Sequence, residues 1–583
     1  MRTNFMRNMS YSVHRIADDP LLATLRNRLG LSGFRAGQRK IIEAVTKGRD
    51  ALVVMPTGGG KSLCYQLPSL VQRGTTLVVS PLLALMKDQV DALIAKNIRA
   101  TFINSSLTAR ESRERVAGLP FADWELIYVA PERFASAEFM RTLAQLDIRL
   151  LAIDEAHCIS QWGHDFRPAY RRLREVRDAL KNPPTLALTA TASAKVQHDI
   201  IANLGLTKAE SFVHGFDRPN LFLGVVHCNS KHRKLERLSK LISDGPALIY
   251  CSTREAVDEV FSALRAKNKC VAKYHAGMSD AERANAQEAY ITDKTQILVA
   301  TNAFGMGIDK ANIRTIIHFN HPGTLEAYYQ EIGRAGRDGL PAHAVLLVSK
   351  SDRNTHEVFI REQCPSLEAV REVWNELGAM RRETKQLELF FTLAQLLARL
   401  KSRGVFQVSS AGGAGRCLVA LEQHGFLNRI NRRDRTMSLR LRVKEFPPNL
   451  RGRQKAVLEA IHDNLSSERW DDLLILKPER LCVDLGIERT QLLLALNGLH
   501  SKGVLDYCRP GACGGVRLLP NKISSAVEHD MSGRRNTLIE SLNTMVTYFE
   551  AACHRKYILE YFGDVPLFAK CGNCTGCASS RQF

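Results

Sequence analysis

The sequence predicts an α/β protein in which two doubly wound parallel-sheet domains stand in series, followed by a mostly helical region and a small cysteine-rich module. Three observations support this prediction. Short β-branched runs, each followed by a helix-length segment, punctuate the first 350 residues, as in parallel strands buried on both faces. Helical patterns replace these runs beyond Ser349, and four cysteines lie near the end of the sequence. Two sets of alternating strands and helices imply two separate sheets.

The strand runs form two sets of five that meet near residues 215–219. The first set comprises residues 51–55, 76–80, 125–129, 150–153 and 185–189, and the second comprises residues 221–226, 247–251, 296–300, 315–319 and 344–348. Because each run is short and almost wholly apolar, we expect helices to cover both faces of each sheet.

The region beyond the two sheets contains two similar segments, residues 417–443 and 490–520. Each has a helix, a glycine turn, a short strand, a turn-rich tip and a second strand, which predicts winged-helix-like units that end in β-hairpins. Arg432, Arg433 and Arg435 make the first hairpin the more suited to DNA. The alternative is a helical packing region without DNA contact.

The composition indicates a multidomain protein with a polyanionic partner. A chain of 583 residues far exceeds the size at which one core stops growing, so we expect about three to five domains. Lys+Arg 81 against Asp+Glu 60 gives a net charge of +21 and a pI near 9.5, which favours a nucleic-acid partner. We expect no membrane span, because no apolar run of about 18 residues occurs. Most cysteines are scattered singly, which suits a reducing compartment.

The first twenty residues, MRTNFMRNMSYSVHRIADDP, are basic but lack the apolar core of a secretion signal. We expect residues 1–18 to form a flexible tail. A transit peptide, or a true start at Met9, are the alternatives.

A glycine-rich loop, MPTGGGKS at residues 55–62, follows the first predicted strand and opens a helix. Its three glycines let backbone amides turn inward and cradle phosphate oxygens. Lys61 would reach the β- and γ-phosphates, and Ser62 would offer a hydroxyl to magnesium. Met55 departs from the glycine that opens the general pattern, and an ordinary loop is the alternative. The residues assigned to ATP in this loop are Thr57, Gly58, Gly59, Gly60, Lys61 and Ser62.

Two adjacent carboxylates follow the predicted strand 150–153. Asp154 suits a magnesium shell, and Glu155 suits a base that orients the attacking water. His157 lies beside them and is a further catalytic candidate. A chance DEAH sequence on a loop is the alternative, but its place behind a phosphate loop favours nucleotide hydrolysis.

A third candidate element lies in the second half, within YYQEIGRAGRD at residues 328–338. If this segment is a helix, Gln330, Arg334 and Arg337 stand at positions i, i+4 and i+7 on one face. Arginines on a packing face would be costly without an anion opposite, and the γ-phosphate held by the other half is such an anion. A solvated basic face is the alternative. We therefore expect the nucleotide in a cleft between the halves.

These elements, in this order, resemble the RecQ family of DNA helicases within superfamily 2. The resemblance covers residues 20–350 and the last fifty residues. Its segments in this chain are LGLSGFRAGQRKII with Phe34, Arg35 and Gln38, SPLLALMKDQV at 80–90, NSS at 104–106, APERF at 130–134, TATA at 189–192, YHAGM at 274–278 and VATNAFGMGIDK at 299–310. The resemblance implies two RecA-like domains, a nucleotide contact from Phe34 and Arg35, adenine recognition by Gln38, and a further nucleotide contact from Asp309.

The resemblance also identifies residues 158–170 as an aromatic-rich loop that couples single-stranded DNA to ATP hydrolysis. Trp162 and Phe166 offer faces on which unpaired bases can stack, and Arg167 can hold a phosphate. Because the loop follows Asp154 and Glu155 directly, DNA on it would affect the carboxylates. Burial of Trp162 and Phe166 in a domain contact is the alternative.

The terminal cysteines have the spacing of a structural zinc site. Cys553, Cys571, Cys574 and Cys577 give C-x17-C-x2-C-x2-C, in which two CxxC steps and a distant fourth thiolate can complete a tetrahedron. Free thiols are the alternative. In the family the zinc module usually follows the motor directly, whereas here about 180 residues intervene. We expect no separate helicase-and-RNase-D-like C-terminal domain, because the sequence stops six residues after Cys577.

These observations predict five parts. They are a flexible tail (residues 1–18), an ATP-binding RecA-like domain (residues 19–215), a second RecA-like domain (residues 216–350), a helical and winged-helix-like accessory region (residues 351–530) and a zinc-binding module (residues 531–583).

The sequence as a whole predicts an ATP-, Mg²⁺- and Zn²⁺-dependent DNA helicase that acts in recombination and repair; the 3′–5′ polarity comes from the resemblance alone. The DNA-contacting candidates besides the aromatic-rich loop are Ser80, Asn104, Thr301 and Asn302. We expect single-stranded and duplex DNA, including forks and junctions, as substrate. A single-stranded-DNA-binding protein or other repair factors are candidate partners. The expected location is the cytoplasm at the bacterial nucleoid, or the nucleus of a eukaryote. An RNA helicase and a DNA-binding regulator with a vestigial ATP site are the alternatives.

Overall fold

The structure is a computed structural model that describes residues 19–577 apart from 57, 161–165, 214, 243–244, 268, 306–309, 386, 431–436, 449, 465–473, 509–512 and 521–524. The chain divides into two compact units. The first comprises Met1–Asn354 with Glu540–Phe583, and the second comprises Thr355–Ile539. The predicted fold class is confirmed, because two parallel sheets are followed by a mostly helical region and a four-cysteine site.

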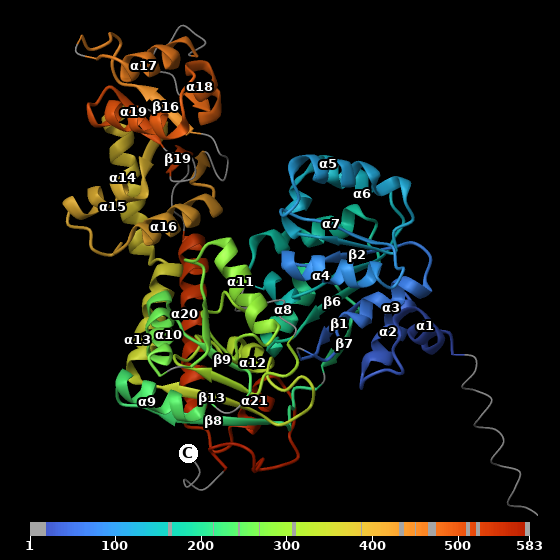
Figure 1. Cartoon of the computed structure of the whole chain (residues 1–583). Helices are drawn as coiled ribbons and strands as arrows, with labels where there is room; N and C mark the ends of the chain where they lie inside the picture. Colours follow the sequence, from blue (N-terminus) through green and yellow to red (C-terminus); the bar gives the residue numbers. More distant parts are fainter. Residues whose placement is uncertain are drawn as a thin grey trace, which may run out of the picture. The chain divides into compact units, whose positions relative to one another are not determined.

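The first sheet is wholly parallel and has the order β3-β4-β2-β5-β6-β1-β7 (Figure 1). Its strands are β1 (Ala51–Val54), β2 (Thr75–Val79), β3 (Ala100–Ile103), β4 (Leu126–Val129), β5 (Ile148–Ile153), β6 (Thr185–Thr189) and β7 (Glu210–Val213). Successive residues of β1 enter different apolar clusters, Leu52 and Val54 on one side and Ala51 and Val53 on the other. Both faces of this sheet are therefore buried, as the continuous apolar runs predict.

Helices accompany the strands of the first sheet. They are α1 (Pro20–Leu29), α2 (Gln38–Thr46), α3 (Leu63–Val71), α4 (Leu83–Ile94), α5 (Ala109–Gly118), α6 (Ala137–Leu143), α7 (Leu173–Ala179) and α8 (Ala194–Leu204), with the 3₁₀ turns η1 (Leu119–Phe121), η2 (Pro131–Ala135), η3 (Ala156–Ile159) and η4 (Pro168–Arg172). Because all strands are parallel, the loops that leave their carboxyl ends meet at one edge of the sheet, where doubly wound folds bind ligands.

The second sheet is also wholly parallel and has the order β10-β11-β9-β12-β13-β8. Its strands are β8 (Leu221–His227), β9 (Ala247–Tyr250), β10 (Val271–Tyr274), β11 (Ile297–Ala300), β12 (Thr315–His318) and β13 (Ala342–Val348), and its helices are α9 (Lys231–Leu241), α10 (Arg254–Arg265), α11 (Asp280–Ile291) and α12 (Leu325–Ile332). The linker (residues 215–220) joins β7 of the first sheet to β8 of the second.

The C-terminal module (residues 540–577) covers the open edge of the second sheet. It contains the end of α20 (Ser525–Phe549) and all of α21 (His554–Tyr561), drawn in red against β8 and β13 in Figure 1. Leu223 of β8 donates its N–H to the Asn573 carbonyl at 3.4 Å and accepts from the Thr575 N–H at 3.0 Å. These bonds pair an edge strand whose backbone groups would otherwise face water.

The second unit is mostly helical and holds two small antiparallel sheets, β14-β19-β15 and β17-β16-β18. Its helices are α14 (Leu367–Thr384), α15 (Leu393–Ser402), α16 (Ala411–Gln423), α17 (Arg453–Asp463), α18 (Pro478–Leu485) and α19 (Arg489–Ser501), and α13 (Lys350–Gln363) runs into it from the first unit. Its strands are β14 (Glu388–Thr392), β15 (Leu427–Ile430), β16 (Met437–Leu441), β17 (Leu474–Leu476), β18 (Leu505–Cys508) and β19 (Cys513–Leu518).

The two predicted hairpins are wrong in their pairing, although their four strands exist. β15 pairs with β19 rather than with β16, and β16 pairs with β18 rather than β18 with β19. Residues 437–508, with their own apolar core, are thus inserted between the paired strands β15 and β19. The local pattern identifies each strand but cannot identify its partner. Arg432, Arg433 and Arg435 lie outside the described residues.

Candidate functional site

The phosphate loop leaves β1 and leads into α3, as predicted. Gly58 and Gly60 have φ of 82° and 78°, in the left-handed region that glycine adopts without strain. The Lys61 ammonium donates to the carbonyls of Met55 at 3.1 Å and Pro56 at 3.4 Å, so it folds back over the loop. Ser62 is the N-cap of α3, where free helix N–H groups attract anions. Thr57 lies outside the described residues.

The two carboxylates stand where β5 ends. The Asp154 N–H still bonds the Val79 carbonyl of β2 at 2.8 Å, and the next residue, Glu155, turns into the left-handed region with φ 48° and ψ 46°. Such a conformation costs about 1–3 kcal/mol for a residue other than glycine, and it is found preferentially at functional sites. Glu155 Oε2 is buried and accepts no hydrogen bond from the described residues. His157 Nδ1 lies 3.4 Å from it and 2.9 Å from Thr189 Oγ1.

The charges of the phosphate loop and the carboxylates act on each other. Burial, together with the Glu155 charge, raises the pKa of Asp154 to about 7, and Lys61 opposes this rise. Burial lowers the pKa of Lys61; the two carboxylates oppose this shift, and the positive charge of Arg337 adds to it. The loop lysine, the strand-end acids and Arg337 of the second sheet therefore share one electrostatic environment.

The arginine turn (residues 333–338) follows α12 and differs from the prediction. The predicted helix would carry Gln330, Arg334 and Arg337 on one face, but α12 ends at Ile332 and the following residues form tight turns. Gly336 has φ 55°, which ends any helical continuation. The prediction of one helical face is therefore wrong, because its spacing assumed a helix through two glycines.

Arg337 nevertheless reaches the phosphate loop, whereas the described contacts of Arg334 lie within the second sheet's own domain. A Cβ built on Gly58 of the phosphate loop would lie 3.7 Å from Arg337 Cγ, so the Arg337 side chain lies against that loop. Arg334 is 4% exposed, and its Nη2 would lie 3.4 Å from a Cβ on Gly305. Gln330 is also buried. The two sheets thus meet where the phosphate loop faces the arginine turn.

The predicted adenine-binding residues hold the phosphate loop from its other side. Gln38 Nε2 donates to the carbonyls of Gly59 at 3.2 Å and Gly60 at 3.1 Å, and Gln38 Oε1 accepts from the Arg35 N–H at 2.8 Å. The Arg35 guanidinium donates to the Gly58 carbonyl. Phe34 packs against the same core as α1 and α2. Arg35 and Gln38 therefore contact the phosphate loop directly, and Phe34 packs in the core beside them.

The predicted DNA-contacting residues lie on loops at the carboxyl ends of the strands. Ser80 and Asn104 are nearly fully buried, and Asn104 accepts hydrogen bonds from Ser106, so this loop presents Ser105 and Ser106 at its surface. Thr301 is buried and Asn302 is exposed. Asp309 lies outside the described residues.

The aromatic-rich loop is described at both ends. Its first part is η3, directly after Glu155, and residues 161–165, including Trp162, lie outside the described residues. Phe166 is half-buried, with the Arg171 guanidinium 5.2 Å from its ring centre. The Arg167 guanidinium donates to the Pro81 carbonyl at 3.2 Å, which ties this loop to the loop that follows β2. The carboxylates, the aromatic-rich loop and a predicted DNA-binding loop are thus adjacent.

The four cysteines form a metal site. The sulfurs of Cys553, Cys571, Cys574 and Cys577 all lie within 4.8 Å of one another, and Cys571 and Cys577 are 3.9 Å apart. Tetrahedral zinc with bonds of about 2.3 Å places its sulfurs roughly 3.8 Å apart, so these residues fit zinc. Burial opposes ionisation of Cys577, but a hydrogen bond from the Gly572 N–H and the neighbouring thiols outweigh it and lower its pKa to about 7.

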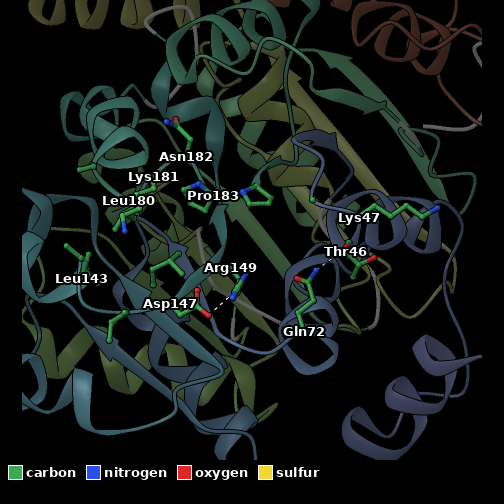
Figure 2. Close-up of a pocket in the computed structure, with 16 residues that line it drawn as sticks. Thr46, Lys47, Gln72, Leu143, Asp147, Arg149, Leu180, Lys181, Asn182 and Pro183 are labelled. Carbon is green, nitrogen blue, oxygen red and sulfur yellow. Dashed lines mark hydrogen bonds and ion pairs between the residues drawn. The ribbon is translucent and has the colours of Figure 1, made fainter.

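A separate cavity of about 610 Å³ lies at the opposite edge of the first sheet (Figure 2). Its lining residues 46–48 and 179–184 precede β1 and β6, and residues 146–149 lie at the start of β5, so it opens at the amino ends of these strands. The phosphate loop and the carboxylates follow the carboxyl ends of the same strands. The cavity is therefore not part of the nucleotide site.

Several residues around the site were not predicted. Arg218 and Asn220 of the linker bind carbonyls of the arginine turn, and Arg555 and Phe562 of the C-terminal module contact the linker. The signal in the sequence was GFDRPN between the two strand sets, where charged and amide side chains occupy a segment too short for an independent element.

Three family models match the chain. Residues 35–200 match the DEAD/DEAH box helicase family, residues 233–339 match the helicase conserved C-terminal domain, and residues 520–578 match the RecQ zinc-binding family. The described helices include none long and apolar enough to cross a membrane.

Bacterial relatives match up to 60% of the chain. It is 46% identical to the ATP-dependent DNA helicase RecQ of Bacillus subtilis over 343 residues, which are 58% of this chain and 58% of that protein. The RecQ of Haemophilus influenzae is 44% identical over 57% of this chain and 54% of its own length. These matches span little more than half of either relative. The probable ATP-dependent DNA helicase RecS of B. subtilis is 40% identical over 60% of this chain and 72% of its own length. With its two parallel sheets, phosphate loop, arginine turn and four-cysteine site, the chain belongs to the RecQ family of ATP-dependent DNA helicases.

Proposed function

We propose that this chain is a DNA-stimulated ATPase that moves 3′–5′ along single-stranded DNA and unwinds duplex DNA in recombination and repair. One observation carries the proposal: Arg337 of the second sheet lies against Gly58 of the phosphate loop on the first. A phosphate group bound at that loop would touch both halves of the motor. Its hydrolysis would therefore change the contact between them.

The nucleotide site divides into a phosphate-binding side and a charge-stabilising side. The amides of Gly58, Gly59 and Gly60, with Lys61, would hold the β- and γ-phosphates, and Gln38 would recognise the adenine. Gln38 now uses both ends of its amide on the protein, so adenine binding has to exchange some of these hydrogen bonds. Arg334 and Arg337 would stabilise the charge that develops on the transferred phosphoryl group.

The residues at the end of β5 fit Mg²⁺. Asp154 has a raised pKa and Glu155 has a buried oxygen that accepts no hydrogen bond from described residues, and nearby Ser62 offers a hydroxyl. Bound Mg²⁺ would supply positive charge between the phosphates. Glu155 would take the proton of the attacking water, and His157 would orient Glu155 from its bond to Thr189. The hydrogen bond between His157 and Thr189 anchors this histidine to the end of β6.

DNA would bind at the loops beside the carboxylates. Stacking on Trp162 and Phe166 tolerates any sequence, and a net charge of +21 favours the phosphate backbone. Arg167 now bonds the Pro81 carbonyl, so a phosphate that recruited Arg167 would loosen the link to the loop after β2. Six residues separate Trp162 from Glu155 along the chain, and Arg167 lies twelve positions after Glu155, so DNA on this loop would affect Glu155 through a short connecting segment. Ser80, Asn104, Thr301 and Asn302 would shape the loops that carry the backbone contacts.

Zinc would have a structural role. Four cysteines leave no coordination position for water, so the metal fixes the module that covers the edge of β8. We further propose forks and junctions as preferred DNA. A single-stranded-DNA-binding protein or other repair factors are the proposed partners, and the bacterial nucleoid, or the nucleus of a eukaryote, is the proposed location.

The proposal is tested by ATPase assays with and without single-stranded DNA, followed by strand displacement from duplexes with a 3′ or a 5′ tail. We expect stimulation by DNA and displacement from the 3′-tailed duplex. Lys61→Ala should abolish ATP hydrolysis while DNA binding, measured by fluorescence anisotropy, survives. Stimulation by RNA in preference to DNA would favour an RNA helicase. Absence of hydrolysis in the wild-type protein would favour a DNA-binding regulator.

A further inference from the structure

The linker (residues 215–220) does more than connect the two sheets, because one of its side chains grips the arginine turn. Arg218 Nη2 donates to the carbonyls of Ala335 at 2.8 Å and Gly336 at 3.0 Å, and Nη1 donates to the Gly333 carbonyl at 3.3 Å. One guanidinium therefore binds three carbonyls of the turn that carries Arg334 and Arg337. The planar fork of arginine suits this divergent set of acceptors, whereas the single ammonium of a lysine does not.

A second linker residue supports the same turn. Asn220 Nδ2 donates to the carbonyls of Gly336 and Leu340, each at 2.9 Å. A Cβ on Gly336 would approach this nitrogen to 2.6 Å, so the turn and Asn220 are closely packed. Arg218 and Asn220 thus hold the turn on the side of the linker.

The surroundings of Arg218 argue against a role in surface charge. Arg218 is half-buried, and burial lowers its pKa. Among the described residues it makes no ion pair, although desolvating a guanidinium without a carboxylate is costly. The hydrogen bonds that compensate this cost all go to the arginine turn. Loss of Arg218 would therefore leave these carbonyls, and the turn, without their main support.

The linker is itself anchored by the C-terminal module. Phe216 stacks on Phe562 with ring centres 4.7 Å apart and planes 5° apart, and both are buried. Arg555 pairs with Asp217 at 2.6 Å, and Asn573 Nδ2 donates to the Pro219 carbonyl at 3.0 Å. The residues before and after Arg218 are thus fixed by contacts with the C-terminal module. A fixed backbone lets Arg218 hold the turn in one position.

We propose that Arg218 is a positioning residue that sets the placement of Arg337 at the phosphate loop. This inference rests on the proposed function, since it acts through the arginine that stabilises the transferred phosphoryl group. A misplacement of about 1 Å in a catalytic group can cost on the order of 10²-fold in rate. Arg218 therefore acts on kcat rather than on ATP binding, which the phosphate loop provides.

The test compares wild type, Arg218→Ala, Arg337→Ala and the double variant in DNA-stimulated ATPase assays. We expect Arg218→Ala to lower kcat on the order of 10²-fold with a KM for ATP within about twofold of wild type. The double variant should lose less than the product of the two single losses, because Arg218 acts through the turn that carries Arg337. A multiplicative loss, an unchanged kcat or a change in KM alone would overturn the inference.

Separate control variants distinguish a folding defect, and a failure of the proposed function, from a failure of the inference. Arg218→Lys keeps the charge and the stem without the fork, so we expect a Tm near wild type and a kcat between wild type and Arg218→Ala. If Arg218→Ala does not fold, a wild-type kcat in Arg218→Lys overturns the inference. If kcat falls in Arg337→Ala but not in Arg218→Ala, the inference is overturned and the proposed function is not. A wild-type kcat in Arg337→Ala overturns the proposed function and the inference together.

Discussion

Glu155 combines a left-handed backbone with a buried carboxylate oxygen, and Asp154 beside it ionises with difficulty. Neither the strained backbone of Glu155 nor the burial of the two carboxylates stabilises the folded protein. Both carboxylates lie where the phosphate loop, Lys61 and Arg337 supply positive charge. At the residue scale these carboxylates therefore lower the stability of the protein until a ligand binds. Substituting one of them should raise the free energy of unfolding and abolish activity.

Asp154→Asn tests this trade-off through its pH dependence. The pKa of Asp154 is raised to about 7 by burial and Glu155, so the folded protein loses stability as the pH rises from about 4 through 7. In metal-free buffer we expect Asp154→Asn to raise the free energy of unfolding by up to about 4 kcal/mol at pH 8 and by less at pH 5.5. Thermal unfolding at both values measures the difference. An equal rise in the free energy of unfolding at both pH values would contradict a raised pKa of Asp154.

The aromatic-rich loop gives a second prediction at this scale. Trp162→Ala and Phe166→Ala should leave the basal ATPase rate within about twofold of wild type and reduce its stimulation by single-stranded DNA on the order of tenfold, because stacking contributes about 1–3 kcal/mol per base. Phe121→Ala is the matched control, since Phe121 is 89% exposed on η1, outside the aromatic-rich loop. Unchanged stimulation in both variants would assign these aromatics to packing.

At the scale of elements, the arginine turn depends on a glycine that tolerates no side chain. Gly336 has φ 55°, and a Cβ there would lie 2.6 Å from Asn220 Nδ2 and 2.8 Å from the Leu340 carbonyl oxygen. Gly339, three residues later, has φ 83° and nothing within 4 Å of such a Cβ. The two positions therefore share a conformational penalty and differ only in packing.

Gly336→Ala should thus displace the turn, whereas Gly339→Ala should only strain it. A left-handed alanine costs about 1–2 kcal/mol, so both variants should lower Tm by a few degrees. We expect Gly336→Ala alone to lower the kcat of ATP hydrolysis, by at least about tenfold, because the turn carries Arg337. Equal kcat values in the two variants would separate the turn from catalysis.

The elements also show how far the sequence predicts this fold. The ten strands predicted for the two parallel sheets lie within two residues of ten observed ones, because parallel strands that are buried on both faces are continuous apolar runs. Within the two parallel sheets, the three unpredicted strands, β3, β7 and β10, all lie at sheet edges. An edge strand pairs on one side only, so residues such as Glu210 and Lys273 are tolerated there and the apolar pattern weakens.

The candidate site was predictable where chemistry is local and unpredictable where it depends on distant packing. The phosphate loop and the DEAH carboxylates each carry their chemistry in a few adjacent residues. Three of the four cysteines lie within seven residues and Cys553 lies eighteen positions before them, and the structure brings the four sulfurs together. The end of α12 had a local signal in Gly333 and Gly336 that a spacing of i, i+4 and i+7 does not take into account. The hydrogen bonds of Arg218 to the arginine turn, in contrast, join residues more than 100 positions apart. Spacing within a segment cannot reveal them.

At the scale of the whole molecule, the zinc site connects to the motor through the linker. The C-terminal module holds Phe216, Asp217 and Pro219 and also covers the edge of β8. Metal loss should therefore affect more than the module itself. Cys574 is fully buried among the four ligands, which makes it a clean point at which to break the site.

Cys574→Ser, or chelation of the wild-type metal, should reduce the zinc content from about one per chain and lower Tm by several degrees, because structural zinc supplies folding free energy. We expect DNA-stimulated ATPase activity to fall together with Tm. Cys270→Ser is the control, since Cys270 is an exposed free thiol. Elemental analysis and thermal unfolding measure the outcome, and an unchanged Tm in zinc-free protein would argue that the metal has no structural role.

The nested topology of the second unit has a consequence for the order of folding. β15 and β19 are neighbours in one sheet, yet residues 431–512 separate them along the chain, and most of this stretch has an apolar core of its own. Bringing β15 and β19 together costs conformational entropy, and this cost is smaller once the residues between them have become compact. The inserted portion, though later in sequence than α14, α15 and α16, has to collapse before their sheet can close. A destabilising substitution within the inserted residues would therefore leave the β14-β19-β15 sheet incompletely folded, both during synthesis and at equilibrium.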